Sequence, residues 1–142
     1  MGQSTDAILF YGFTAEEEWE WMEGLEDPYE ISDHICALLD GPADPGWNTG
    51  DKYKAYKVER DDFIRANFGI LFECSSHCSG EYPMPFITTE DLHSRAGRGC
   101  PVRADNTTTP QDPAPFLMLA KLLGIEDITV DDIGWHLVSD WS

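Results

Sequence analysis

Residues 7–13 read AILFYGF, and this short run of apolar and aromatic residues decides how the fold is interpreted. Short apolar runs that are rich in aromatic and branched residues are typical of buried β-strands. We therefore predict a buried strand here and expect it to form part of a sheet.

The segments that follow this strand predict an α+β domain. The expected helices cover residues 14–23, 28–40, 52–66 and 115–123, and the further strands cover residues 70–77, 84–88 and 133–141. Strands and helices do not alternate regularly in this order, which disfavours a doubly wound parallel sheet. We expect a single domain over residues 1–142, with a small, mostly antiparallel sheet of about four strands and helices packed on one of its faces.

Three local patterns make more specific predictions. Thr14 is followed three residues later by Glu17, the pattern of a capping box, which predicts the start of the first helix. Trp47 lies in the Gly- and Pro-rich segment 41–51 and is expected to pin that loop to the body. Residues 89–115 contain four prolines and are expected to form a long irregular loop.

Charge is distributed unevenly along the chain, whose net charge is -18. Residues 1–51 contain 13 acidic residues and no Lys or Arg, residues 52–103 contain 8 basic and 7 acidic residues, and residues 104–142 contain 1 basic and 7 acidic. The carboxylates of the first block must face water or a basic partner, because burying an unpaired charge costs too much free energy. We also expect the basic helix 52–66 to lie against the acidic helices, with Asp61 and Arg65 paired along it.

The densest part of this charge is the candidate partner-binding site. Nine carboxylates fall within 18 residues, and on two short helices they would form a negative face. Carboxylates one helical turn apart are separated by about 5.4 Å, which is in the range of phosphate spacings in nucleic acid. Such a face can occupy a basic groove that evolved for nucleic acid, while the alternative is a solvated surface that only confers solubility. The candidate residues, with two tryptophans as apolar anchors, are Glu16, Glu17, Glu18, Trp19, Glu20, Trp21, Glu23, Glu26, Asp27, Glu30 and Asp33.

Several segments resemble a family of small proteins encoded by tailed bacteriophages. They are MGQSTDAILFYGF at residues 1–13, HCSGEYPMPF at 77–86, and LLGI followed by GWHLVSDW, which ends at residue 141. The family has no settled function, so no catalytic residue is carried over. The resemblance implies the cytoplasm of a bacterial host as the place of action, and small phage proteins often inhibit host machinery such as CRISPR–Cas complexes.

Charge and resemblance together favour a non-enzymatic inhibitor of the DNA-mimic type that needs no cofactor. Its expected partner is a basic host protein, such as a CRISPR–Cas effector or another nucleic-acid-binding complex, and not nucleic acid itself or a membrane. No apolar stretch approaches the ~18 residues that span a bilayer. A phage assembly accessory is a further possibility.

An alternative site, a small thiol- or zinc-dependent module, lies around Cys74, His77 and Cys78. These residue types suit zinc or a Cys–His nucleophile. In an extended strand, however, Cys74 and Cys78 would be about 13 Å apart at ~3.3 Å per residue, which is too far for one ion, and neighbours such as His77 and Cys78 would point to opposite faces. Further zinc ligands would have to come from His34, Cys36 or Cys100.

Three arginines lie beside glycines at residues 95–103. The segment contains neither a GxxxxGK[ST] nor a GxGxxG phosphate-binding motif. Because the chain as a whole is strongly negative, a nucleic-acid site there is disfavoured. We expect Arg95, Arg98 and Arg103 to pair with the chain's own carboxylates.

Overall fold

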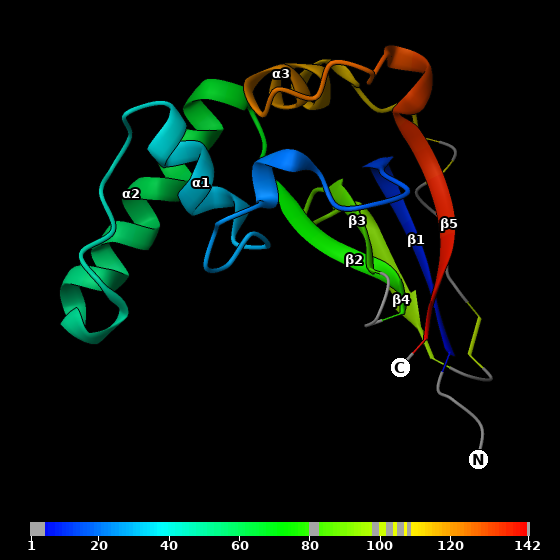
Figure 1. Ribbon diagram of the computed structural model, residues 1–142, viewed down its shortest axis with the longest axis horizontal. Coiled ribbons are helices and arrows are strands. Elements are labelled where there is room, and N and C mark those ends of the chain that lie inside the picture. Colours follow the sequence, from blue (N-terminus) through cyan, green and yellow to red (C-terminus); the bar gives the residue numbers. More distant parts are fainter. Residues whose placement is uncertain are drawn as a thin grey trace.

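The AILFYGF run lies inside strand β1 (Thr5–Thr14) of the computed structural model, as the sequence predicts. The structure describes residues 5–79, 83–97, 100–101, 104, 107 and 109–141. The other strands and the helices, drawn in Figure 1, are α1 (Ile31–Leu38), α2 (Asp51–Phe68), β2 (Glu73–Ser79), β3 (Pro83–Thr88), β4 (His93–Ala96), α3 (Ala114–Leu122) and β5 (Gly134–Trp141). Short 3-10 turns occur at η1 (Glu20–Met22), η2 (Trp47–Thr49) and η3 (Val130–Asp132). This combination confirms the predicted α+β class.

β1 pairs with three other strands of a mixed sheet whose strand order is β3-β2-β5-β1-β4. It pairs antiparallel with β5 along one edge and with β4 along the other. Only the short β2–β5 pairing is parallel among the described strands, so the sheet is mostly antiparallel, as expected. The end of β1 also pairs with β3, through Phe13 and Ile87, and this pairing joins β1, β5, β2 and β3 into a closed ring.

Alternate residues of β1 enter two different cores. Ile8 and Phe10 lie on the face that the ring encloses, where they pack with Phe86, and the Phe10 and Phe86 rings stack with their centroids 4.3 Å apart. Tyr11 and Phe13 face outward and belong to the larger core that the sheet shares with the helices. The whole run is apolar because both faces of this strand are buried.

Gly12 allows β1 to approach β3 closely. A Cβ atom at this position would lie 1.8 Å from the carbonyl oxygen of Ile87, and the residue has a φ of +156°. Next to it, the Thr88 hydroxyl donates a hydrogen bond of 2.8 Å to the Tyr11 carbonyl. A side chain at residue 12 would therefore push apart the two strands that close the ring.

The helices pack on the outer face of the sheet. Figure 1 shows α1 and α2 side by side at one flank of the sheet and α3 across one of its ends. Ile35, Ile64 and Phe116, one from each helix, are buried in the same cluster as Phe13. Because α1 and α2 contact each other, the prediction that the basic helix lies against the acidic region is confirmed for α1.

The predicted helix over residues 14–23 is wrong. β1 continues through Thr14, and only the η1 turn follows it. The Thr14 hydroxyl donates a 2.9 Å hydrogen bond to the Pro85 carbonyl, and its oxygen lies 3.1 Å from His77 Nε2. This hydroxyl is therefore engaged with the neighbouring strands and does not cap a helix.

Two further expectations about loops are corrected. Trp47 is 83% exposed, so it does not pin its loop to the body. The segment 89–115, expected to be irregular, contains β4, and several of its other residues lie outside the described ranges.

The second predicted helix is also shorter than expected, since α1 begins only at Ile31. Among the described residues, no helix combines the length and the apolar character that crossing a membrane requires.

Candidate functional site

Seven of the predicted carboxylates form an exposed acidic segment, which we define as residues 16–27. None of the seven has an ion pair within the described part of the chain. They lie on the η1 turn and on the bends around it, and not on a helix. The exposed carboxylates belong to Glu16, Glu17, Glu18, Glu20, Glu23, Glu26 and Asp27.

Aromatic side chains hold the acidic segment against the core. The ring of Trp19 meets Phe13 edge-on with centroids 5.6 Å apart, and Met22 is 4% exposed. The rings of Trp19 and Trp21 stack 6.2 Å apart, and Trp21 stacks in turn on His34 at 5.1 Å. Both tryptophans are half-buried, so they position the carboxylates around them and expose only part of each ring.

The other two predicted carboxylates are bound to the chain's own arginine. Arg60, whose side chain is 8% exposed, lies 3.3 Å from Glu30 and 3.0 Å from Asp33. The Tyr56 hydroxyl also donates a hydrogen bond to Asp33, and Arg60 reaches Asp61 at 3.0 Å. Glu30 and Asp33 therefore join α1 to α2 and are separate from the acidic segment.

The protonation states of this network follow from its burial. Burial disfavours the charged form of Arg60, but hydrogen bonds to Asp33 and Asp61 outweigh it, so the pKa of the guanidinium is raised. Burial raises the pKa of Glu30, and the Coulombic attraction of Arg60 opposes this shift. The arginine thus stays charged and acts as the anchor of the α1–α2 pair.

The alternative Cys–His site is not assembled as a metal centre. Cys74 and His77 both lie in the extended strand β2, where Cys74 belongs to the outer core and His77 reaches Thr14 on β1. Burial raises the pKa of the Cys74 thiol to about 12, so it is not a ready nucleophile. Cys78 is half-buried and has a φ of +78°. Within the described residues, no group of three His, Cys, Asp or Glu side chains is placed to hold a metal ion.

Arg95 pairs with the chain's own carboxylates, as the sequence predicts. It lies 2.6 Å from Asp6 on β1 and also binds Asp140 on β5. Arg98 and Arg103 lie outside the described residues.

No family model, curated protein or solved structure matches the chain.

The acidic segment presents a dense negative charge, and the core holds this segment in place. Such a surface attracts cationic surfaces over a distance that salt shortens.

Proposed function

We propose that the protein is a bacteriophage-encoded acidic inhibitor that binds a host nucleic-acid-handling protein through the acidic segment. The observation that supports it is the presence of seven exposed carboxylates in 12 residues without an ion pair in the described structure. A basic groove that evolved for nucleic acid attracts such a segment, and the bound segment excludes nucleic acid from the groove. Long-range charge attraction would accelerate the encounter.

The shape of the segment favours one form of competition with nucleic acid within this proposal. Because η1 is a short 3-10 turn and no α-helix is present there, the carboxylates do not repeat along a helix. Competition with nucleic acid therefore depends on charge density and not on a match to the phosphate spacing. Because Trp19 and Met22 already fix the segment, little conformational entropy is lost on binding.

The partner class to test first is a CRISPR–Cas effector, because the sequence resembles phage proteins. Glu30 and Asp33 are excluded from the proposed contact surface, since both bind Arg60. The exposed parts of Trp19 and Trp21 lie among the carboxylates and supply its apolar contacts.

Competition with DNA tests the proposal directly. Purified Cas effector–guide RNA complexes are mixed with a fluorescent target duplex, and the chain is titrated in at about 50 mM and 300 mM salt. The chain is expected to displace the duplex at low salt and to lose affinity at high salt. Replacing four carboxylates (Glu16→Gln, Glu17→Gln, Glu20→Gln and Glu23→Gln) is expected to weaken displacement by roughly a hundredfold, at about 0.7 kcal/mol per charge.

A variant with the same net charge controls for the global field. It carries Glu59→Gln, Glu126→Gln, Asp127→Asn and Asp131→Asn, all at exposed positions without a described ion pair. The proposal requires this variant to compete almost as well as the natural chain. The proposal would be wrong if both variants lost the ability to displace DNA to the same extent, or if displacement did not change with salt concentration. Either result would show that the acidic segment is not the contact surface.

A further inference from the structure

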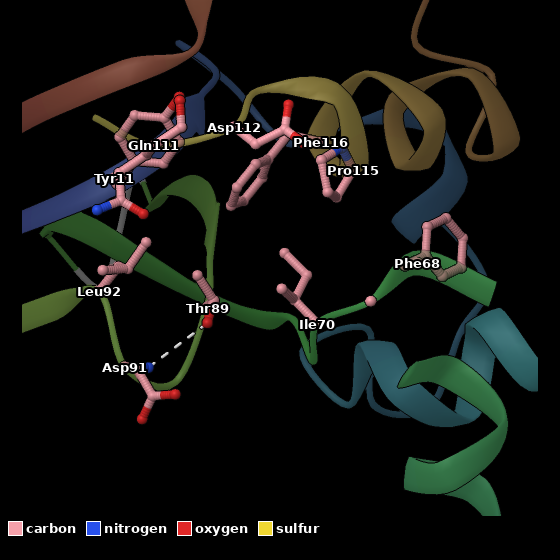
Figure 2. Close-up of a pocket in the computed structure, with 11 residues that line it drawn as sticks. Tyr11, Phe68, Ile70, Thr89, Asp91, Leu92, Gln111, Asp112, Pro115 and Phe116 are labelled. Atoms are coloured by element: carbon pink, nitrogen blue, oxygen red, sulfur yellow. Dashed lines mark hydrogen bonds between the residues drawn. The ribbon is translucent and has the colours of Figure 1, made fainter. Parts of the chain in front are cut away.

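A cavity of about 430 Å³ lies on the outer side of the sheet, away from the acidic segment. Figure 2 shows Thr89, Ile70 and Leu92 on one side of it and Phe116 and Pro115 on the opposite side. A water molecule takes up about 30 Å³ of liquid, so the space has room for a ligand of roughly a dozen non-hydrogen atoms. The lining residues are Tyr11, Phe68, Gly69, Ile70, Thr89, Asp91, Leu92, Gln111, Asp112, Pro115 and Phe116.

The walls of the cavity are mainly aromatic and aliphatic. Tyr11, Phe68 and Phe116 contribute rings, and Phe116 is 1% exposed, so it forms a fixed part of the wall. The rings of Tyr11 and Phe116 pack edge to face with centroids 5.6 Å apart. Aromatic walls favour a ligand with an apolar body, and ring faces also attract cations.

The charged groups of the cavity all have the same sign. Asp91 and Asp112 are among the lining residues, whereas none of the lining residues is Lys, Arg or His. Figure 2 places the two aspartates on different sides of the space. Burial and the nearby Asp112 carboxylate both raise the pKa of the Tyr11 phenol, so this ring stays neutral beside the charge.

Each aspartate keeps at least one oxygen available. Asp91 has no ion pair in the described part of the structure, because the neighbouring Arg65 binds Glu90 and Asp62. One oxygen of Asp112 accepts a 3.0 Å hydrogen bond from the Ala114 N–H at the start of α3. The other oxygen takes no part in this hydrogen bond.

We propose that this cavity is a binding site for a small organic cation with an aromatic or aliphatic body, such as an aromatic amine. The apolar body packs against Phe116, Leu92 and Ile70, and the ammonium group lies at the rim of the cavity, where the exposed carboxylates of Asp91 and Asp112 attract it. An anionic ligand of the same shape is repelled by both carboxylates and by a chain of net charge -18. This site is independent of the acidic segment and of any macromolecular partner.

Nuclear magnetic resonance titration of the full chain with tryptamine tests the proposal. Tryptamine should produce saturable shifts of the backbone amides of Ile70, Leu92 and Phe116, whereas indole-3-propionate, an anion with the same ring, should produce none. The variant Asp91→Asn with Asp112→Asn should bind tryptamine roughly tenfold more weakly. Asn at residue 112 can still accept the Ala114 N–H, so the start of α3 is preserved.

The matched control removes two carboxylates from the acidic segment, Glu16→Gln and Glu17→Gln, and so has the same net charge as the cavity variant. It should bind tryptamine like the natural chain. Equal weakening in both variants would show that only the global charge attracts the amine, and the proposal would be wrong. It would also be overturned by equal binding of indole-3-propionate, or by the absence of saturable shifts with tryptamine.

Discussion

Gly12 and Gly24 both have positive φ angles, but their surroundings differ. A Cβ on Gly12 would meet the Ile87 carbonyl at 1.8 Å, while a Cβ on Gly24 would meet nothing within 4 Å. We predict that Gly12→Ala lowers the free energy of unfolding by about 3 kcal/mol or more, through strain and the separation of β1 from β3. Gly24→Ala should cost only about 1 kcal/mol, for backbone strain alone.

Urea denaturation of both glycine variants measures this difference. If the two substitutions cost the same, the close approach of β1 to β3 does not contribute, and backbone strain alone explains the cost. A Gly12→Ala chain that does not fold is compatible with the prediction only if Gly24→Ala folds normally.

Two histidines should make stability depend on pH. Burial lowers the pKa of His77 and of His34 below the ordinary value of 6.5. The unfolded chain therefore takes up protons on these rings at a higher pH than the folded chain does. Stability is then unaffected by the two rings well above pH 6.5 and falls as the pH falls from 6.5 toward the folded-state pKa values.

We predict a decrease in the free energy of unfolding between about pH 7 and pH 5.5. The double variant His34→Gln with His77→Gln should flatten this slope, because Gln does not titrate and can still reach Thr14. Urea midpoints at a series of pH values provide the measurement. An unchanged slope in the double variant would assign the pH dependence to other groups.

At the level of single residues, the sequence predicted an ion pair on α2 whose partners differ in the structure. Tyr56 and Arg60 fall on the inner side of α2, and both are buried. The expected Asp61–Arg65 pair is absent from the described ion pairs, because Asp61 binds Arg60 while Arg65 reaches Asp62 and Glu90. Several carboxylates compete for each arginine along one helix, and the tertiary packing decides between them.

On the scale of elements, the acidic segment shows why a capping pattern can mislead. Trp19 and Trp21 are two residues apart and stack on each other with their planes 20° apart. Residues i and i+2 do not share a face of an α-helix, so this stacking is incompatible with the predicted helix. The aromatic packing and the engaged Thr14 hydroxyl together outweigh the local preference for a capped helix.

β4 could not have been predicted from its own residues. Its sequence, HSRA, lacks the alternation of apolar and polar residues that marks a strand. The strand forms because the edge of β1 offers hydrogen-bonding partners from Ala7 to Phe10. Arg95 then binds carboxylates on β1, its neighbour in the sheet, and on β5, the next strand beyond β1, and these contacts join residues far apart in the sequence.

The joining of α1 to α2 by Arg60 yields a prediction at this scale. Arg60→Met should lower the free energy of unfolding by about 2 kcal/mol, because it leaves Asp33 without its cation beside a buried surface. Arg65→Met removes exposed pairs from the same helix and should cost less than about 1 kcal/mol. Thermal and urea unfolding of the two variants give the comparison, and an equal cost would mean that the buried network does not hold α1 against α2.

For the whole molecule, the sequence could predict the acidic segment, because its exposure depends on charge alone. The cost of burying carboxylates predicted that the acidic block faces water or a basic partner, and seven of its nine candidate carboxylates are exposed without a described ion pair, whereas Glu30 and Asp33 bind Arg60. The cavity gave no such signal, since its walls come from segments as distant as Tyr11 and Phe116. Only the folded chain brings these apolar residues together beside Asp91 and Asp112.

A concentration of like charge without counter-charge destabilises the fold through self-repulsion. We therefore predict that Glu16→Gln, Glu17→Gln, Glu20→Gln and Glu23→Gln together raise the free energy of unfolding by about 0.5–1 kcal/mol at 10 mM salt. Urea denaturation at 10 mM and 500 mM salt provides the measurement, and the gain should shrink toward zero at the higher salt, where the Debye length is only about 4 Å. A gain in stability combined with a loss of DNA displacement would mean that the segment is kept for binding at a cost to folding. If the variant is instead less stable than the natural chain at low salt, the carboxylates support the fold through contacts of their own, and their exposure does not indicate a binding surface.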